Sequence, residues 1–336
     1  MDPLIFEPYL RPQIWGGRQL ETALHKRLPP AGTFGESWEL SAHPHHVSRV
    51  AEGPFASAAL TQIWTDHAEE LTGSRSPGEF PLLIKSLDCR VPLSVQVHPD
   101  DARAHDLLGE PRGKTEAWVI LAAGPDARIW AGLKPGITRA DLERHLDAGT
   151  VADCLHSFVP RPGDCVYLPA GTVHAVGGGV LIAEVQQSSD ATFRLFDWNR
   201  PGPDGKPRTL HREQSLASID WQAGPVDPVR PQRIIAAQEG VSHERLVECP
   251  YFALSRYTLS GSARLTAAGL SIWMMLDGSA ELRSKASGDE RRFERGETVL
   301  IPASAPSLEW TTDRNAPATL LAIDGFVAKE SGQPAP

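Results

Sequence analysis

The sequence lacks several features that mark other classes of protein. No stretch of its 336 residues approaches the roughly 18 consecutive apolar residues of a membrane-spanning helix. Its amino-terminal segment has no basic region followed by a long apolar run, so we expect no signal peptide. Its four cysteines are widely scattered and form no CxxC pair, which favours reduced thiols over disulfides. We therefore expect a cytoplasmic protein with no membrane partner.

Positive charge is also scarce. The chain has 42 acidic and 33 basic residues and a formal net charge of −9, which argues against the basic face that nucleic-acid binding requires. Hydrophobic residues at 41% and charged residues at 22% are ordinary globular values, so wholesale disorder is excluded. The 29 glycines and 29 prolines together make about a sixth of the chain. That content is typical of many short strands joined by turns.

Alternating polar and apolar residues predict a mainly β protein with a few short helices. Over residues 93–98 the apolar side chains alternate with Ser94, Gln96 and His98, which places these three polar residues on one strand face. Further strands are predicted at 116–121, 164–168, 172–176 and 179–185. Helices are predicted at about 57–71 and 211–219, and at 138–148, where Thr138 and Asp141 have the spacing of a capping box.

A weak internal repeat divides the chain. GDCVYLP at 163–169 is echoed by GETVLIP at 296–302, and EAWVIL at 116–121 by SIWMML at 271–276. The polar residues do not repeat. When the two copies are aligned, Ser307 occupies the position of His174, and Ser271 occupies the position of Glu116. We expect a catalytic domain over 1–230 with helical insertions and a second, metal-free domain over 231–336. The second domain is expected to cover apolar surface of the first or to shape its pocket entrance.

The segment GDCVYLPAGTVH at 163–174 resembles the second sequence motif of the cupin superfamily. Cupins are antiparallel jelly-roll barrels that commonly hold a metal ion, so the resemblance implies two cupin-type barrels in this chain. A first cupin motif has a counterpart in Gln96, His98 and Glu116, although 17 residues between His98 and Glu116 imply an inserted loop or helix. With His174 this set suits zinc, and iron, manganese or cobalt also fit it.

Further segments resemble a narrower family, the type I mannose-6-phosphate isomerases in their short bacterial form. The resemblance is carried by WGG (15–17), GESWELS (35–41), FPLLIKSLD (80–88), PLSVQVHPDD (92–101), GKTEAW (113–118), PAGTVHAVGGG (169–179) and EVQQSSDATFRLFDWNR (184–200). It covers roughly residues 5–220 well and the rest only in outline. One departure is Phe193, where the family more often has tyrosine.

The resemblance implies one zinc ion per chain, held by Gln96, His98, Glu116 and His174. It also implies that a sugar phosphate is bound by Ser94, Lys114 and Arg194, of which Arg194 also counts as catalytic. Glu36 and Glu39 are interpreted as buried structural partners.

The implied activity is the interconversion of mannose 6-phosphate and fructose 6-phosphate through a cis-enediol. This reaction needs a base that works close to neutral pH. Glu184 is the first candidate and Lys85 the second, although Lys85 could instead be an edge-strand lysine that reaches water. An isomerase of another phosphorylated aldose, a cupin oxygenase and a non-catalytic sugar sensor remain alternatives. The sequence carries no signal for a particular oligomer and is compatible with a monomer.

Overall fold

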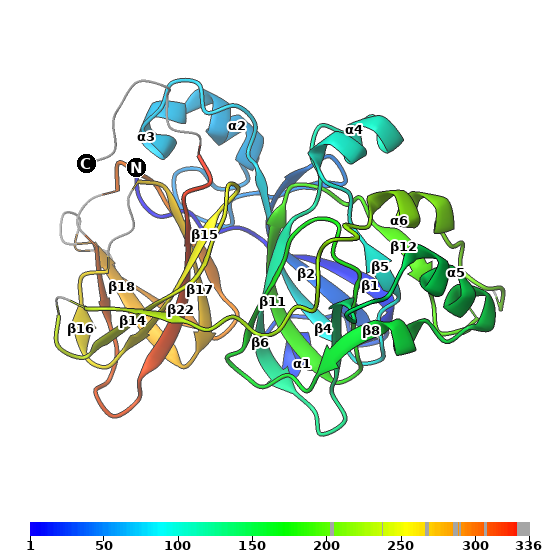
Figure 1. Ribbon diagram of the computed structural model, residues 1–336. Coiled ribbons are helices and arrows are strands. Elements are labelled where there is room, and N and C mark those ends of the chain that lie inside the picture. The colour runs from blue at the N-terminus through cyan, green and yellow to red at the C-terminus, as the bar shows by residue number, and fades with distance from the viewer. Residues whose placement is uncertain are drawn as a thin grey trace.

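The computed structural model describes residues 1–201, 205–236, 238–265, 269–284, 288, 290–305 and 308–327. The described chain is mainly β, with antiparallel strand pairing throughout and a few short helices, as the sequence predicts. Its strands form four sheets, which make up two units side by side (Figure 1). We call the sheets of β1–β12 the first unit and those of β13–β22 the second unit.

The first unit has a seven-stranded and a five-stranded sheet. In spatial order, the larger sheet contains β1 (Tyr9–Gly17), β2 (Phe34–His43), β4 (Leu82–Cys89), β11 (Val180–Gln187), β6 (Glu116–Ala123) and β9 (Cys165–Leu168), with β3 (His46–Val47) beside β2. The smaller sheet contains β12 (Phe193–Phe196), β5 (Val95–Val97), β10 (His174–Val176), β7 (Ile129–Leu133) and β8 (Leu155–Phe158).

The second unit repeats this plan. Its larger sheet runs β13 (Gln232–Ile234), β14 (Val241–Glu248), β15 (Ala253–Leu259), β22 (Ala318–Asp324), β17 (Ser271–Asp277) and β20 (Thr298–Ile301). Its smaller sheet runs β16 (Ser262–Ala263), β21 (Leu308–Thr311), β18 (Ser279–Ser284) and β19 (Glu290–Glu294).

The register of the strands confirms the internal repeat. Glu116 pairs with Leu168 across β6 and β9, and Ser271 pairs with Ile301 across β17 and β20. The interior of the second unit is filled by apolar side chains that include Trp273, where the first unit has polar groups. Ser307, the expected counterpart of His174, lies outside the described residues. The domain boundary near residue 230 stays a prediction, since it falls in the stretch between α6 and β13.

The helices lie around the sheets. They are α1 (Gln19–Thr22), α2 (Leu60–Asp66), α3 (Ala68–Thr72), α4 (Asp101–Leu108), α5 (Arg139–Ala148) and α6 (Arg212–Ser218), with a 3-10 turn at Val151–Cys154. The capping box of α5 is confirmed, and α4 is the predicted insertion between His98 and Glu116. None of the described helices has the length and apolar character needed to cross a membrane.

The single helix predicted over 57–71 is wrong in its extent. It begins only at Leu60 and is interrupted at His67, whose φ of −124° and ψ of 31° are not helical. Residues before Leu60 are held in other conformations, because Ala59 forms a β-bridge with Arg49 and Ser57 has a φ of 69°. The local apolar pattern did not reveal this tertiary pairing.

The larger sheets of the two units share one hydrophobic core. Alternate residues of β4, β6 and β11, such as Ile84, Ala117 and Ala183, belong to the same buried cluster as Ile272 and Ile323 of the second unit. The second unit therefore covers apolar surface of the first, as predicted. Because side chains alternate along a strand, the neighbours of these residues point to the opposite face of the sheet. Lys85, Glu116, Trp118 and Glu184 are such neighbours, and they lie together there.

Candidate metal centre and substrate cavity

Three buried side chains converge where strands of both sheets of the first unit begin or end. His98 follows β5, Glu116 begins β6 and His174 begins β10. The Nε2 atoms of His98 and His174 lie 3.5 and 3.3 Å from separate oxygens of Glu116. All three residues are at most 2% exposed, and their ligand atoms lie within 4.8 Å of one another. Among the described residues this is the one such group of three His, Cys, Asp or Glu side chains.

Both imidazoles are held in the form that a metal ion needs. The Nδ1 atoms of His98 and His174 lie 2.8 and 2.9 Å from the carbonyl oxygens of Ala191 and Thr172. A carbonyl only accepts, so each Nδ1 carries the proton and each Nε2 lone pair faces Glu116. Burial, aided by the charge of Lys114, lowers the pKa of His98 to about 4, and burial lowers the pKa of His174. The rings are therefore neutral at neutral pH and free to ligate.

Glu116 supplies a charged carboxylate. Burial alone would raise its pKa, but the ammonium of Lys114, with Nζ 2.8 Å from Oε2, holds the pKa well below its usual range. Neither oxygen accepts a well-formed hydrogen bond from the described residues, although both are fully buried. Lys114 balances the charge of the carboxylate, but buried oxygens that lack well-formed hydrogen bonds can still ligate an ion.

Gln96 lies beside the three. It pairs with His174 in the register of β5 and β10, and its side-chain nitrogen lies 3.2 Å from His174 Nε2. A half-turn of the amide places Oε1 at the same point. Two neutral imidazoles, one carboxylate and one amide oxygen fit a divalent cation, because each group can direct a lone pair toward the shared space.

A cavity of about 300 Å³ adjoins this cluster, and every residue predicted to bind the substrate lines it. Its lining includes the predicted residues Lys85, Ser94, Gln96, Lys114, Glu184 and Arg194. It also includes polar residues that sequence reasoning did not propose for the site, namely Arg11, Gln13, Glu36, Asp190, Thr192 and Arg208.

Some of the missed residues had a readable signal. Arg11, Gln13 and Trp15 alternate along β1, so a period of two could have placed all three on one face. Glu36 is buried as expected, yet it also lines the cavity. Asp190 lies in a loop, where no periodicity indicates which way a side chain points.

Glu184 and Lys85 are paired across the middle of the larger sheet. They are directly opposite in the register of β11 and β4, and Lys85 Nζ lies 3.3 Å from Glu184 Oε1. Trp118 donates its indole N–H to the other oxygen, Oε2, at 3.0 Å. Lys85 is only 4% exposed, and β4 lies between β2 and β11. The edge-strand interpretation of Lys85 is therefore wrong.

The end of the cavity near β12 carries an excess of positive charge. Burial lowers the pKa of Arg194, and so does the charge of Arg208 beside it, while Asp197 acts in the opposite direction. Asp197 accepts two hydrogen bonds from Arg208, both at 2.6 Å. Arg194 Nη1 donates to the carbonyl of Thr209, but its buried Nε has no acceptor among the described residues. This end is suited to a phosphate dianion.

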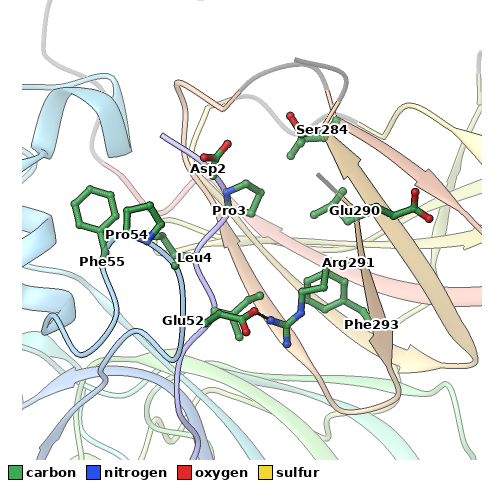
Figure 2. Close-up of a pocket in the computed structure, with 14 residues that line it drawn as sticks. Asp2, Pro3, Leu4, Glu52, Pro54, Phe55, Ser284, Glu290, Arg291 and Phe293 are labelled. Carbon is green, nitrogen blue, oxygen red and sulfur yellow. Dashed lines mark ion pairs between the residues drawn. The ribbon is translucent and has the colours of Figure 1, made fainter. Parts of the chain in front are cut away.

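A separate cavity of about 370 Å³ lies at the second unit (Figure 2). It is bounded by the amino-terminal segment, the 52–55 loop and β18, β19 and β21, and Arg291 forms an ion pair with Glu52 there. Its lining contains none of the predicted site residues. The cluster of His98, Glu116 and His174, the Lys85–Glu184 pair and the cationic end of the cavity therefore all lie in the first unit.

Comparison with known proteins agrees with this location. A family model described as the catalytic domain of type I phosphomannose isomerase matches residues 4–116. The mannose-6-phosphate isomerase ManA of Bacillus subtilis is 37% identical over 267 residues, which cover 79% of this chain and 82% of that protein. The Streptococcus mutans mannose-6-phosphate isomerase is 32% identical over 314 residues, which cover 93% of this chain and 96% of that protein. The crystal structure of a Bacillus subtilis mannose 6-phosphate isomerase superposes with a TM-score of 0.86 at 28% identity. The superposition covers 96% of this chain and 100% of that one.

Proposed function

The chain belongs to the type I phosphomannose isomerase family, and from this premise we infer that it interconverts mannose 6-phosphate and fructose 6-phosphate. The observation that carries the inference is the cavity lined by Glu184 and Arg194, whose lining residues Gln96 and Lys114 contact the cluster of His98, Glu116 and His174. A non-catalytic sensor has no need for such a set, and no observation favours another sugar phosphate.

We propose that the metal is one zinc ion, held by His98, Glu116 and His174 with Gln96 as the fourth protein ligand. The set of two neutral nitrogens and two oxygens supports a borderline ion, and such an ion would supply Lewis-acid stabilisation of negative charge on the sugar oxygens. The rest of the chemistry is assigned to side chains of the cavity.

Isomerisation moves a proton from carbon 2 of the aldose to carbon 1, while a hydroxyl proton passes to the carbonyl oxygen. We assign the carbon-to-carbon transfer to Glu184, whose Oε1 is buried beside the cavity with Lys85 Nζ 3.3 Å away as its ion-pair partner. Removal of the proton from carbon 2 gives the cis-enediol, which keeps both hydroxyls on one side, and return of the proton to carbon 1 completes the reaction. Trp118 orients the carboxylate through Oε2 and leaves Oε1 for the substrate.

The phosphate is assigned to Arg194, Lys114 and Ser94. Binding energy at this remote group orients the reacting carbons and so contributes to turnover. Lys114 also lies 2.8 Å from Glu116 Oε2, so it joins the phosphate end of the cavity to the metal ligands.

We propose a cytoplasmic location as well. Three of the four cysteines are buried free thiols, which is usual in a reducing compartment.

Removal and return of the metal tests the proposed function directly. We expect formation of fructose 6-phosphate from mannose 6-phosphate to stop after chelation and to recover when zinc is added back. The measurement is the initial rate of the full chain in the three states, with circular dichroism to show that chelation leaves it folded. A folded, zinc-loaded protein that converts other sugar phosphates but not mannose 6-phosphate would contradict the substrate, and one with no turnover would favour a sensor.

Replacement of Arg194 by alanine tests the phosphate site. We expect KM for mannose 6-phosphate to rise about 10–100-fold, because a charged hydrogen-bonding partner of the phosphate contributes about 1.5–3 kcal/mol. Arg194→Lys should recover only part of the loss, since lysine keeps the charge without the fork. Arg212→Ala is the matched control, because Arg212 pairs with Asp147 on the surface. Equal rates on mannose and mannose 6-phosphate would sink this assignment.

A further inference from the structure

Asp101, the first residue of α4, accepts hydrogen bonds from three distant parts of the chain. Its Oδ1 accepts from the backbone N–H of Gly113 at 2.7 Å and from the side-chain amide of Gln187 at 2.9 Å. Its Oδ2 accepts from the hydroxyl of Tyr251 at 3.1 Å. The mechanism above uses none of these four residues. Asp100, not Asp101, caps the helix, so helix formation does not account for these bonds.

The bonds converge on residues 113–116, the segment that carries Lys114 and Glu116. Asp101 holds the amide of Gly113, and Gln187 Oε1 accepts from the amide of Thr115 at 2.8 Å. The amide of Lys114 between them donates to the carbonyl of Pro99 at 3.0 Å. A Cβ atom at Gly113 would lie only 2.5 Å from that same carbonyl oxygen, so the two stretches of backbone are in direct contact. Three successive amides are thus fixed.

Tyr251 reaches this segment from the second unit. It lies in the turn between β14 and β15, where the amide of Cys249 donates to the carbonyl of Phe252 at 3.0 Å. Phe252 is fully buried in the core that both units share. Burial and the Asp101 carboxylate raise the pKa of Tyr251 to about 12, so its phenol stays protonated and donates. The hydroxyl therefore extends from a firmly packed turn.

We propose that Tyr251 and Asp101 are positioning residues through which the second unit fixes the metal- and phosphate-binding segment 113–116. The inference rests on the proposed function, because that function gives Glu116 and Lys114 their roles. The second unit has Ser271 at the position equivalent to Glu116. In this proposal it contributes to the reaction by positioning residues 113–116, without touching the substrate. Groups bonded directly to a metal ligand typically change metal binding about 10–100-fold, and Asp101 acts on the ligand-bearing segment through the amide of Gly113.

The test compares zinc affinity in four full-length variants by equilibrium competition with a chromophoric chelator. Asp101→Ala removes all three acceptor contacts and should weaken zinc binding about 10–100-fold. Asp101→Asn should stay close to wild type, since its amide oxygen still accepts from Gly113 and Gln187 while its amide nitrogen donates to Tyr251. Tyr251 lies one hydrogen bond further from the metal site, so Tyr251→Phe should weaken zinc binding only roughly 3–10-fold, less than loss of a direct outer-sphere partner does. Tyr257→Phe, the same change at a ring stacked on His243, should change nothing.

Thermal unfolding of the metal-free variants separates positioning from stability. A lower Tm with unchanged zinc affinity in both Asp101→Ala and Tyr251→Phe would overturn the proposal. A loss in Asp101→Asn as large as in Asp101→Ala would also overturn it, because charge and not hydrogen-bond geometry would then be responsible. If Asp101→Ala does not fold, the zinc affinities of Tyr251→Phe and Tyr257→Phe are compared, and equal affinities would overturn the proposal. Failure of the wild-type chain to bind zinc contradicts the proposed function instead, before any variant is compared.

Discussion

Replacement of Glu116 by glutamine is expected to leave a folded protein that holds almost no zinc and has almost no isomerase activity. The change removes the negative charge between the two neutral imidazoles of His98 and His174. It also leaves the ammonium of Lys114 buried without its partner at 2.8 Å. Breaking a buried ion pair from one side costs about 3–5 kcal/mol of folding stability. Loss of the anionic ligand itself should lower zinc affinity by more than the roughly 10–100-fold that loss of an outer-sphere partner costs. Metal content after dialysis against buffered zinc, measured with the isomerase rate, checks this result.

The chain offers a matched control for this variant. Glu39 forms another buried ion pair, with Lys26 Nζ 2.6 Å from its Oε2, but it does not line the candidate cavity. Glu39→Gln should therefore lower the temperature of unfolding and leave zinc affinity unchanged. A Glu116→Gln protein that retained one zinc ion per chain through dialysis would remove Glu116 from the ligand set.

Much of the fold follows from local patterns because strands and capped helices have local causes. Short apolar runs predicted the strands around Glu116 and Glu184, and the Thr138–Asp141 pair predicted the start of α5. The internal echo between Trp118 and Trp273 predicted equivalent positions, and the register of β6 and β17 confirms them. The late start of α2 was missed because a bridge from Arg49 to Ala59, not the helix's own residues, sets where the helix begins.

The candidate site was predictable to a similar extent. Gln96 and His98 share a strand face by spacing alone, and His174 was found by its motif. The burial of Lys85 could not be inferred, because it depends on β4 lying between β2 and β11, and strand order is set by the whole fold. The contact between Tyr251 and Asp101 spans 150 residues, and no pattern within either segment points to the other.

Replacement of Glu184 by glutamine is expected to separate catalysis from metal binding. The amide is nearly the same size, and its oxygen can still accept the indole N–H of Trp118, so the geometry should persist. It cannot take a proton from carbon, so kcat should fall about 10²–10⁴-fold, the usual contribution of a general base. Zinc content should stay at wild-type level, because Glu184 is not among the proposed ligands. Initial rates, together with uptake of deuterium from heavy water into the sugar, measure the loss.

The same experiment decides between Glu184 and Lys85 as the base. Lys85 lies only 3.3 Å from Glu184 Oε1, so loss of either residue disturbs the other, and a fall in rate alone does not separate them. If Glu184 is the base, Glu184→Asp should recover part of the deuterium uptake, because the carboxylate remains but lies one methylene further back. Lys85→Gln should then slow the reaction and still permit uptake. Near-normal turnover of a zinc-loaded Glu184→Gln protein, with uptake abolished in Lys85→Gln, would transfer the base to Lys85.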